Sequence, residues 1–239
     1  MSHLILVRHG QSEWNSQKRF TGWVDIDLTA QGKLEAVKAG ELIKEKKINI
    51  NYFYTSLQKR AINTLNLILS TLRVKDKKII KAWELNERHY GALTGLNKDE
   101  MRKIYGEQKI LEFRRSWSIA PKPLNKNSPY HPINIEIYKD IPHDKIPDTE
   151  SLKDTYDRVV SYFKSNIFSL LKNNNNILIS AHGNSLRSLY KFLFKIDEIK
   201  ISKLEIPTGN PLVINFNEKL EVIDVFYLDK SRAKDLVVF

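Results

Sequence analysis

Residues 4–15 read LILVRHGQSEWN, which joins an apolar run to a run of mostly polar residues. Its first four residues are apolar, as in a strand that is buried on both faces. The strand then runs directly into Arg8 and His9. Arginine is rarely fully buried without a partner, so this junction predicts a functional site at the carboxyl end of the strand.

The composition is that of a globular protein. The chain has 239 residues, of which 41% are hydrophobic and 28% are charged, and it has no cysteine, which excludes a disulfide framework and thiolate chemistry. The net charge of +11 indicates anionic partners, although a solvated lysine surface explains much of it equally well. No nucleic-acid-binding motif is present, so we expect a small phosphorylated partner and no nucleic acid. Without an apolar leader or a run of about 20 apolar residues, we expect a cytoplasmic location and no membrane partner.

Apolar runs alternate with helical periodicities along the chain. Strands are expected at 4–7, 51–55, 79–83, 177–181, 212–216 and 222–227, and helices at 31–47, about 60–72, after 97, at 151–172 and after 183. The strands are apolar on both faces. This order therefore predicts an α/β fold in a single domain, residues 1–239, with a mostly parallel central sheet and helices on both faces.

Three further expectations concern individual segments. In the helix at 31–47, the apolar Leu34, Val37 and Leu42 are expected to lie towards one face. The helix at 151–172 is expected to be the longest and continuous. Residues 118–148 hold six of the eight prolines, which predicts an irregular excursion over the surface.

Two apolar strands each end in a His-Gly pair. His9-Gly10 follows the first strand, and His182-Gly183 follows the strand at 177–181. The carboxyl ends of parallel strands meet at one edge of the sheet, where ligands bind in α/β proteins. A lone histidine after a strand is usually a loop or core residue, but two matched corners favour a site.

Other polar residues fall at neighbouring strand ends. Arg60 opens the helix after the second strand, and Glu87-Arg88 follows the third. With the two histidines and Arg8, these residues form a constellation of two His, three Arg and one Glu. Two His and one Glu are a common zinc set, but the arginines would repel a cation and no HExxH spacing is present, so we expect no metal.

The remaining chemistry is phosphoryl transfer with a histidine nucleophile. Arginine forks bind phosphate in a bidentate manner, and nearby arginine charge favours the neutral, nucleophilic imidazole. A second histidine can stabilise charge on the transferring group, and a carboxyl group must protonate the leaving alkoxide. Glu87 is the natural candidate for that proton transfer.

The sequence resembles the histidine phosphatase superfamily through RHG, and more closely the cofactor-dependent phosphoglycerate mutases. The matching stretches are LVRHGQSEWN, RFTGWVDIDLT, YTSLQKRA, LNERHYGALTGLNK, the RR pair at 114–115, ESLKDTYDRV, SAHGNSLR and IPTGNPLV. They cover the chain from residue 4 to about 228. RHG alone is a weak signal, whereas LNERHYGAL together with AHGNSLR is highly specific.

The resemblance implies a role for each matching residue. His9 becomes the nucleophile that forms phosphohistidine, Glu87 the proton donor and acceptor, and Arg8, Arg60 and His182 the phosphate clamp. The implied substrate-binding residues are Ser12, Asn15, Thr21, Gly22, Arg88, Tyr90, Lys98, Arg114, Arg115, Gly183 and Asn184. The family is commonly dimeric or tetrameric, which implies a homodimer or homotetramer.

The reaction implied by the resemblance interconverts 3-phosphoglycerate and 2-phosphoglycerate, with 2,3-bisphosphoglycerate as the priming cofactor. The alternatives are a bisphosphoglycerate mutase or phosphatase, or a broad histidine-type phosphatase. Bisphosphoglycerate mutases usually carry Gly at position 12 and Cys-Ser at positions 21 and 22, where this chain has Ser12 and Thr21-Gly22. Broad phosphatases typically lack the Arg114-Arg115 pair.

The sequence departs from the family at two places. Asn63 stands where the family often has histidine, and a small effect is expected because Arg60 is intact. The chain ends in DKSRAKDLVVF, whereas related mutases usually continue into a longer tail thought to cover the mouth of the site. We therefore expect more bisphosphate hydrolysis than in a full-tailed relative, unless residues 118–148 or the apolar 236–239 cover the mouth.

Overall fold

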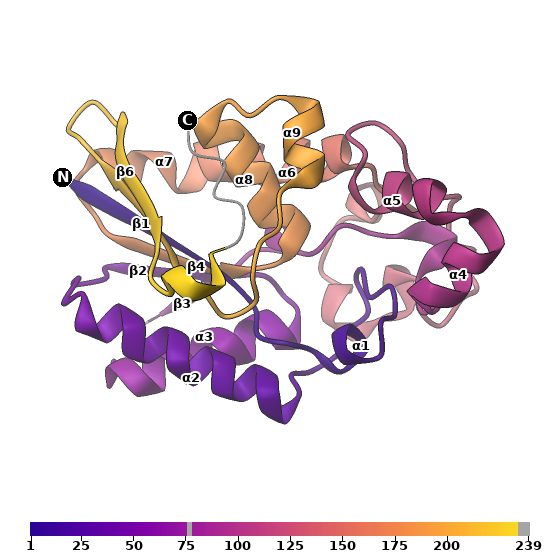
Figure 1. Ribbon diagram of the computed structural model, residues 1–239, viewed down its shortest axis with the longest axis horizontal. Coiled ribbons are helices and arrows are strands. Elements are labelled where there is room, and N and C mark those ends of the chain that lie inside the picture. Colours follow the sequence, from indigo (N-terminus) through magenta and orange to yellow (C-terminus); the bar gives the residue numbers. More distant parts are fainter. Residues whose placement is uncertain (76–77, 234–239) are drawn as a thin grey trace.

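The computed structural model describes residues 1–75 and 78–233 of the chain, and its centre is a six-stranded sheet (Figure 1). The strands are β1 (Ser2–Arg8), β2 (Tyr52–Thr55), β3 (Ile79–Lys81), β4 (Ile177–Ala181), β5 (Leu212–Phe216) and β6 (Val222–Tyr227), and their order in the sheet is β3-β2-β4-β1-β5-β6. β3, β2, β4 and β1 run parallel, whereas β5 pairs antiparallel with β1 and β6 pairs antiparallel with β5. The predicted α/β fold with a mostly parallel sheet is confirmed.

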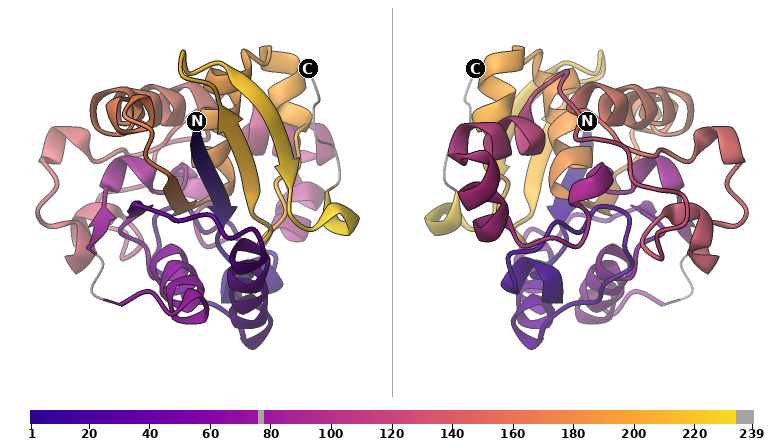
Figure 2. Two further views of the ribbon diagram at one scale, coloured as in Figure 1. Left: turned by 90° about the vertical axis from the view of Figure 1, so that its left-hand side faces the viewer. Right: turned by 90° about the vertical axis from the view of Figure 1, so that its right-hand side faces the viewer.

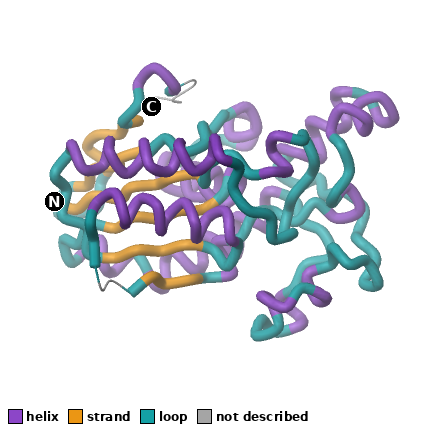
Figure 3. The backbone as a smooth tube through the Cα atoms, turned by 90° about the horizontal axis from the view of Figure 1, so that it is seen from below, coloured by secondary structure: helices purple, strands orange, loops and turns teal. Residues whose placement is uncertain are grey.

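Helices cover both faces of the sheet, as the two side views and the view from below show (Figures 2 and 3). The α-helices are α1 (Glu13–Ser16), α2 (Ala30–Glu45), α3 (Lys59–Leu72), α4 (Lys98–Tyr105), α5 (Glu107–Arg115), α6 (Leu152–Asn166), α7 (Phe168–Lys172), α8 (Gly183–Phe194) and α9 (Glu198–Lys203). α2 and α3 lie on one face, and α6, α7 and α8 lie on the other (Figure 2).

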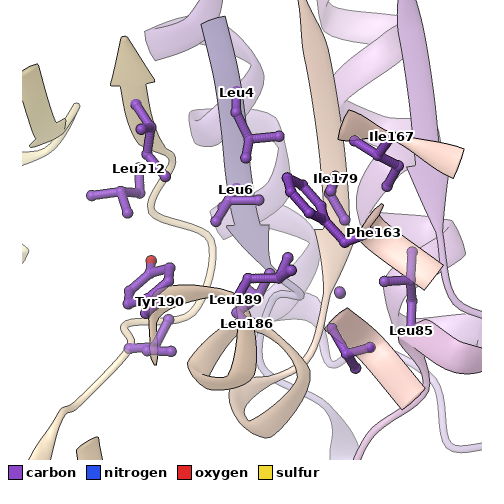
Figure 4. Packing of buried hydrophobic residues seen from close by; sticks show 14 of the residues in the cluster. Leu4, Leu6, Leu85, Phe163, Ile167, Ile179, Leu186, Leu189, Tyr190 and Leu212 are labelled. Atoms are coloured by element: carbon purple, nitrogen blue, oxygen red, sulfur yellow. The ribbon is translucent and has the colours of Figure 1, made fainter. Parts of the chain in front are cut away.

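The side chains of β1 alternate between two apolar cores. Leu4 and Leu6 pack with residues of α6 and α8, including Phe163, on one face (Figure 4). Ile5 and Val7 pack on the opposite face, against residues of α2 and α3. Successive side chains of a strand point to opposite faces, so a strand covered on both sides must be apolar at every position. This explains the uninterrupted LILV run and makes β1 a rigid support for the residues that follow it.

The expectation that one apolar face of α2 includes Leu34 was wrong, whereas Val37 and Leu42 are half-buried. Leu34 is 65% exposed, whereas Ala36, Ala39 and Ile43 are buried. Small residues face α3, and an added Cβ at Gly40 would lie 2.7 Å from the Thr71 Cβ. Close approach of the two helices, and not the size of the apolar side chains, therefore selects the buried face.

Two other elements differ from expectation. The helix expected at 151–172 breaks at Ile167 into α6 and α7, while Phe163, Ile167 and Leu171 remain buried. Because the spacing of four continues through the break, periodicity does not detect it. The strand expected at 79–83 ends at Lys81, and Trp83–Leu85 form a 3₁₀ helix.

Residues beyond the carboxyl ends of the strands form a cap, seen at the right of Figure 3. It contains α4, α5 and the 118–148 segment, which carries the 3₁₀ helices Pro132–Asn134, Glu136–Tyr138 and His143–Lys145. Tyr138 of this segment is fully buried, and its hydroxyl group donates to the Trp23 carbonyl oxygen. The segment is therefore more ordered and more deeply anchored than its prolines suggest.

Within 1–75 and 78–233, no helix is long and apolar enough to cross a membrane. In the same ranges, no group of three or more His, Cys, Asp or Glu side chains is arranged to hold a metal ion. The apolar residues 236–239, expected as a substitute lid, lie outside the described residues.

Candidate active site

Two adjacent parallel strands bring the two histidines together. β1 and β4 pair so that Arg8 lies opposite Ala181, and the His9 N–H continues the ladder by donating to the Ala181 carbonyl oxygen at 2.9 Å. His182 follows Ala181 directly. The centroids of the two imidazole rings are 4.9 Å apart. The two His-Gly corners therefore meet at one point, at the edge of the sheet where the sequence placed them.

The hydrogen bond of His9 determines which ring nitrogen can react. Nδ1 lies 2.7 Å from the Gly10 carbonyl oxygen, which can only accept, so Nδ1 carries the proton and Nε2 keeps its lone pair. Burial and the charges of Arg60 and Arg8 hold the pKa of His9 well below its ordinary value. His9 is therefore a neutral imidazole at physiological pH, with Nε2 available as a nucleophile.

His9 opens into a strongly cationic cavity beyond the carboxyl ends of β1 and β4. The cavity is lined by Arg8, His9, Asn15, Thr21, Gly22, Arg60, Glu87, Tyr90, Lys98, Arg114, Arg115, Gly183, Asn184, Arg187 and Glu205. Six of these side chains are cations and two are carboxylates. Such a lining attracts a small polyanion and repels a metal cation.

The guanidinium groups of Arg8 and Arg60 are fixed by backbone oxygens. Arg8 Nη1 donates to the Ile206 carbonyl oxygen at 2.7 Å. Arg60 is 1% exposed and donates from Nη1 to Val24 and from Nη2 to Gly22, both at 2.9 Å. Fixed donors lose little entropy when a phosphate binds, and they need no reorganisation during the reaction.

Lys98 is the cation whose charge is most easily changed. Burial and the neighbouring charges of Arg114 and Arg8 lower the pKa of Lys98 to about 8. A bound anion would have the opposite effect on this pKa. The Lys98 ammonium is therefore mostly charged at neutral pH, and its charge is sensitive to what occupies the cavity.

Glu87 presents one carboxylate oxygen to the cavity. Its Oε1 accepts from the backbone N–H groups of Arg88 at 2.8 Å and Asn184 at 3.2 Å. Among the described residues, none donates a hydrogen bond to Oε2, which lies beside Gly183. Oε2 is therefore the oxygen that can carry a proton to or from a bound molecule.

His182 supports this arrangement from beneath the cavity. It is fully buried, and its Nε2 lies 2.7 Å from the Ser56 hydroxyl oxygen. Burial and the charges of Arg60 and His9 hold the pKa of His182 well below its ordinary value. The two histidines therefore do not repel each other, because neither carries a positive charge.

The sequence matches the family described as the histidine phosphatase superfamily (branch 1) over residues 4–130 and 125–228. The chain belongs to this superfamily. Its RHG corner and its second His-Gly corner are the two halves of the site described above. The resemblance inferred from the sequence is thus confirmed.

Within the histidine phosphatase superfamily, the chain is similar to proteins named 2,3-bisphosphoglycerate-dependent phosphoglycerate mutase. It is 68% identical over 239 residues to the 2,3-bisphosphoglycerate-dependent phosphoglycerate mutase of Pelagibacter ubique (strain HTCC1062), with all of both chains covered. It is 48% identical to the protein of that name from Caulobacter sp. (strain K31), covering 99% of this chain and 98% of the relative.

Solved structures confirm the histidine phosphatase fold. A mycobacterial glucosyl-3-phosphoglycerate phosphatase in complex with VO3 matches with a TM-score of 0.67 at 19% identity, covering 89% of this chain and 92% of that one. Bacillus stearothermophilus YhfR matches with a TM-score of 0.67 at 20% identity, covering 91% and 92%. At such low identity, these likenesses concern the fold alone.

Most of the expected site residues line the cavity of this histidine phosphatase superfamily member, but three do not. Besides His182, these are Ser12 and Arg88. The Ser12 hydroxyl accepts from the Asn15 N–H and caps α1. Arg88 is fully buried and donates to the carbonyl oxygens of Glu150 and Ile119. Their contacts shape the cavity wall from behind.

Two lining residues were not expected from the sequence. Arg187 donates from Nη1 to the Asn184 side-chain oxygen at 2.7 Å and so orients that amide toward Tyr90. Arg187 lies four residues after Gly183, and this helical spacing is a signal that could have identified it. Glu205 forms an ion pair with Arg115. It comes from a loop after α9, and no pattern in the sequence indicates its position.

Proposed function

We propose that this protein is a 2,3-bisphosphoglycerate-dependent phosphoglycerate mutase that interconverts 3-phosphoglycerate and 2-phosphoglycerate through phosphohistidine at His9. The observation that carries the proposal is the neutral His9 imidazole, with Nε2 free, in a cavity lined by six cations. The names of the relatives at 48% and 68% identity support the mutase over the bisphosphatase and broad phosphatase alternatives.

The proposed nucleophilic step uses the fixed geometry of His9. Its Nε2 attacks a phosphorus atom, and the Nδ1–H bond to the Gly10 carbonyl oxygen stabilises the positive charge that develops on the ring. Arg8 and Arg60, with His182, stabilise charge on the transferring phosphoryl group. Because β1 is buried on both faces, it holds His9 in a fixed position for attack on the substrate. The burial of His9 also limits the access of water to it.

The proposed proton transfer uses Glu87. Oε2 gives a proton to the substrate oxygen when its phosphoryl group leaves for His9, and it takes a proton from the hydroxyl group that attacks phosphohistidine. The remaining binding residues hold the carboxylate and the second phosphate position; these are Asn15, Thr21, Gly22, Tyr90, Lys98, Arg114, Arg115, Gly183 and Asn184. Ser12 and Arg88 contribute from behind the cavity wall.

The cavity fits the priming cofactor. 2,3-Bisphosphoglycerate carries two phosphates and a carboxylate, and the excess of cations over carboxylates in the lining suits such a polyanion. When bound, it supplies the phosphoryl group that primes His9. No metal has a part in the proposed mechanism.

The proposal includes the molecular setting of the enzyme. The enzyme acts on a small phosphorylated substrate in the cytoplasm and has no nucleic-acid or membrane partner. Its single domain, residues 1–239, assembles as a homodimer or homotetramer. The resemblance to phosphoglycerate mutases supports these statements. Light scattering after size-exclusion chromatography would test the assembly.

The proposed function is tested by combining an assay with covalent labelling. We expect turnover of 3-phosphoglycerate to depend on added 2,3-bisphosphoglycerate, and we expect radiolabelled bisphosphate to leave acid-labile phosphate on the enzyme. A folded His9→Ala variant should lose both turnover and labelling, because no neighbouring group can take the place of the nucleophile. Labelling that persists in this variant would assign the phosphoryl acceptor elsewhere.

A further inference from the structure

Arg158 of α6 uses two donors of its guanidinium group on the Glu150 carboxylate and the other three on carbonyl oxygens of residues 84–87. Nε and Nη2 donate to the two carboxylate oxygens of Glu150, at 2.6 and 2.9 Å. Nη1 donates to the carbonyl oxygens of Glu84 at 2.6 Å and Asn86 at 2.9 Å, and Nη2 donates to that of Glu87 at 3.0 Å. A guanidinium group has five N–H donors, so all of them are satisfied.

Glu150 forms hydrogen bonds at the other end of this segment, at His89. Its Oε2 accepts from the His89 N–H at 2.7 Å, and its backbone N–H donates to the His89 carbonyl oxygen at 3.0 Å. The backbone is therefore fixed on both sides of Glu87, at Asn86 and at His89. The Arg158 and Glu150 side chains are only 9% and 4% exposed, so water does not compete for these bonds.

We propose that Arg158, paired with Glu150, is a positioning residue for proton transfer by Glu87. Arg158 is not among the residues that line the cavity. It sets the path of the backbone from which the Glu87 carboxylate reaches the reacting oxygen. This inference rests on the proposed function, because it concerns the efficiency of the proton-transfer step.

The pattern of contacts separates this role from simple stabilisation. A buried ion pair alone is weak evidence for stability, because desolvation offsets its attraction. Three of the five bonds, however, go to carbonyl oxygens within four consecutive residues that include Glu87. A lysine has three donors on one nitrogen and lacks the planar fork, so it cannot hold the carboxylate and all three carbonyl oxygens together.

The test separates turnover from binding in four proteins, namely the wild type and the variants Arg158→Lys, Glu87→Gln and Arg102→Lys. Arg102 is the matched control, since it also forms ion pairs, with Asp99 and Glu107, but lies on α4. The turnover number kcat is measured with 2,3-bisphosphoglycerate present. The Kd of 3-phosphoglycerate is measured by calorimetry on the unprimed enzyme, which cannot turn over.

We expect Arg158→Lys to lower kcat by about 10- to 100-fold while Kd stays within about twofold, because a displacement near 1 Å costs turnover and not binding. Glu87→Gln should show the same pattern with a loss of about 10²- to 10⁴-fold. Arg102→Lys should match the wild type in both quantities. A kcat loss below about threefold in Arg158→Lys, or a rise in Kd in proportion to the kcat loss, overturns the inference.

Folding of each variant is checked by thermal melting. If Arg158→Lys does not fold, Glu150→Gln takes its place, since it keeps the side-chain size and removes one carboxylate acceptor. An about tenfold loss of kcat at unchanged Kd is then expected, and an unchanged kcat overturns the inference. A wild type without mutase activity contradicts the proposed function, whereas an active wild type with unaffected variants contradicts only the role of Arg158.

Discussion

Lys98 shows how a single side chain can make substrate binding depend on pH. Its pKa is lowered to about 8 by burial and by the charges of Arg114 and Arg8. Below this value the ammonium group is charged and attracts an anionic substrate. Above it the lysine is neutral, and the cavity loses one of its six cations.

We therefore expect kcat/KM for 3-phosphoglycerate to fall as the pH rises through 8, by up to about tenfold per pH unit, since this ratio reports the titration of the free enzyme. Lys98→Arg should remove this limb, because arginine stays charged throughout the range. The measurement is a profile of kcat/KM from pH 6.5 to 9.5 for both proteins. An identical alkaline limb in Lys98→Arg would show that another group titrates there.

At this scale, the sequence predicts those residues that follow strands or belong to recognisable motifs. His9 and His182 could be placed together because each directly follows an apolar strand. Glu205 could not be placed, since its ion pair with Arg115 depends on how α9 packs beside α5. The bonds of Arg158 were equally inaccessible, because they join α6 to a turn about 70 residues earlier in the chain.

The contact between helix α2 and the loop after β1 links an element of the fold to the active site. An added Cβ on Gly32, in the first turn of α2, would lie 2.0 Å from the backbone oxygen of Gln11. An added Cβ on Gly10 would lie 2.1 Å from the backbone oxygen of Gly32. Only glycine permits the backbone of α2 to approach residues 10–11 so closely. The loop formed by these residues begins next to His9.

Gly32→Ala should therefore reduce both stability and activity. We expect a loss of about 1–3 kcal/mol in the free energy of unfolding from overpacking, which exceeds the gain of up to about 1 kcal/mol in helix propensity. We also expect kcat to fall at least about tenfold, because the displaced loop moves His9. Denaturant unfolding and steady-state kinetics measure the two effects.

Gly40→Ala is the matched control in the same helix. There the added Cβ meets the side chain of Thr71 and no backbone atom of the site. It should change stability but leave kcat within about twofold of the wild type. Equal losses of activity in both variants would show that the kinetic effect arises from α2 as a whole and not from the contact with the loop.

The elements also show where sequence patterns lose their predictive power. Alternation of apolar strands and helices was sufficient to predict the sheet, because β1, β2 and β4 are apolar on both faces. The buried face of α2 was missed because small residues such as Ala36 and Gly40 form much of it, whereas the large apolar Leu34 is exposed. Hydrophobic spacing measures side-chain polarity, whereas the approach of two helices depends on side-chain volume.

Charge is the property of the whole molecule that bears most directly on function. The net charge is +11, and six cations lie in the cavity together with two carboxylates. Two explanations for substrate attraction are available, the overall charge of the protein and the local field of the cavity. A cavity with walls of low dielectric constant concentrates the field, so the local contribution should dominate.

We expect kcat/KM for 3-phosphoglycerate to fall several-fold between about 0.02 and 0.2 M ionic strength. The reason is that salt shortens the distance over which charges attract, to about 10 Å at 0.1 M. The value of kcat should change much less, since the bound substrate is shielded from salt.

The double variant Lys44→Glu, Lys46→Glu separates the two explanations. These exposed lysines lie at the end of α2, which leads to the beginning of β2 and is thus remote from the carboxyl ends of the strands. Each substitution replaces a positive charge with a negative one, so it lowers the net charge by two units, and it leaves the cavity intact. The variant should therefore keep the wild-type dependence on salt. A markedly weaker dependence in the variant would assign the attraction to the overall charge of the protein instead of the cavity.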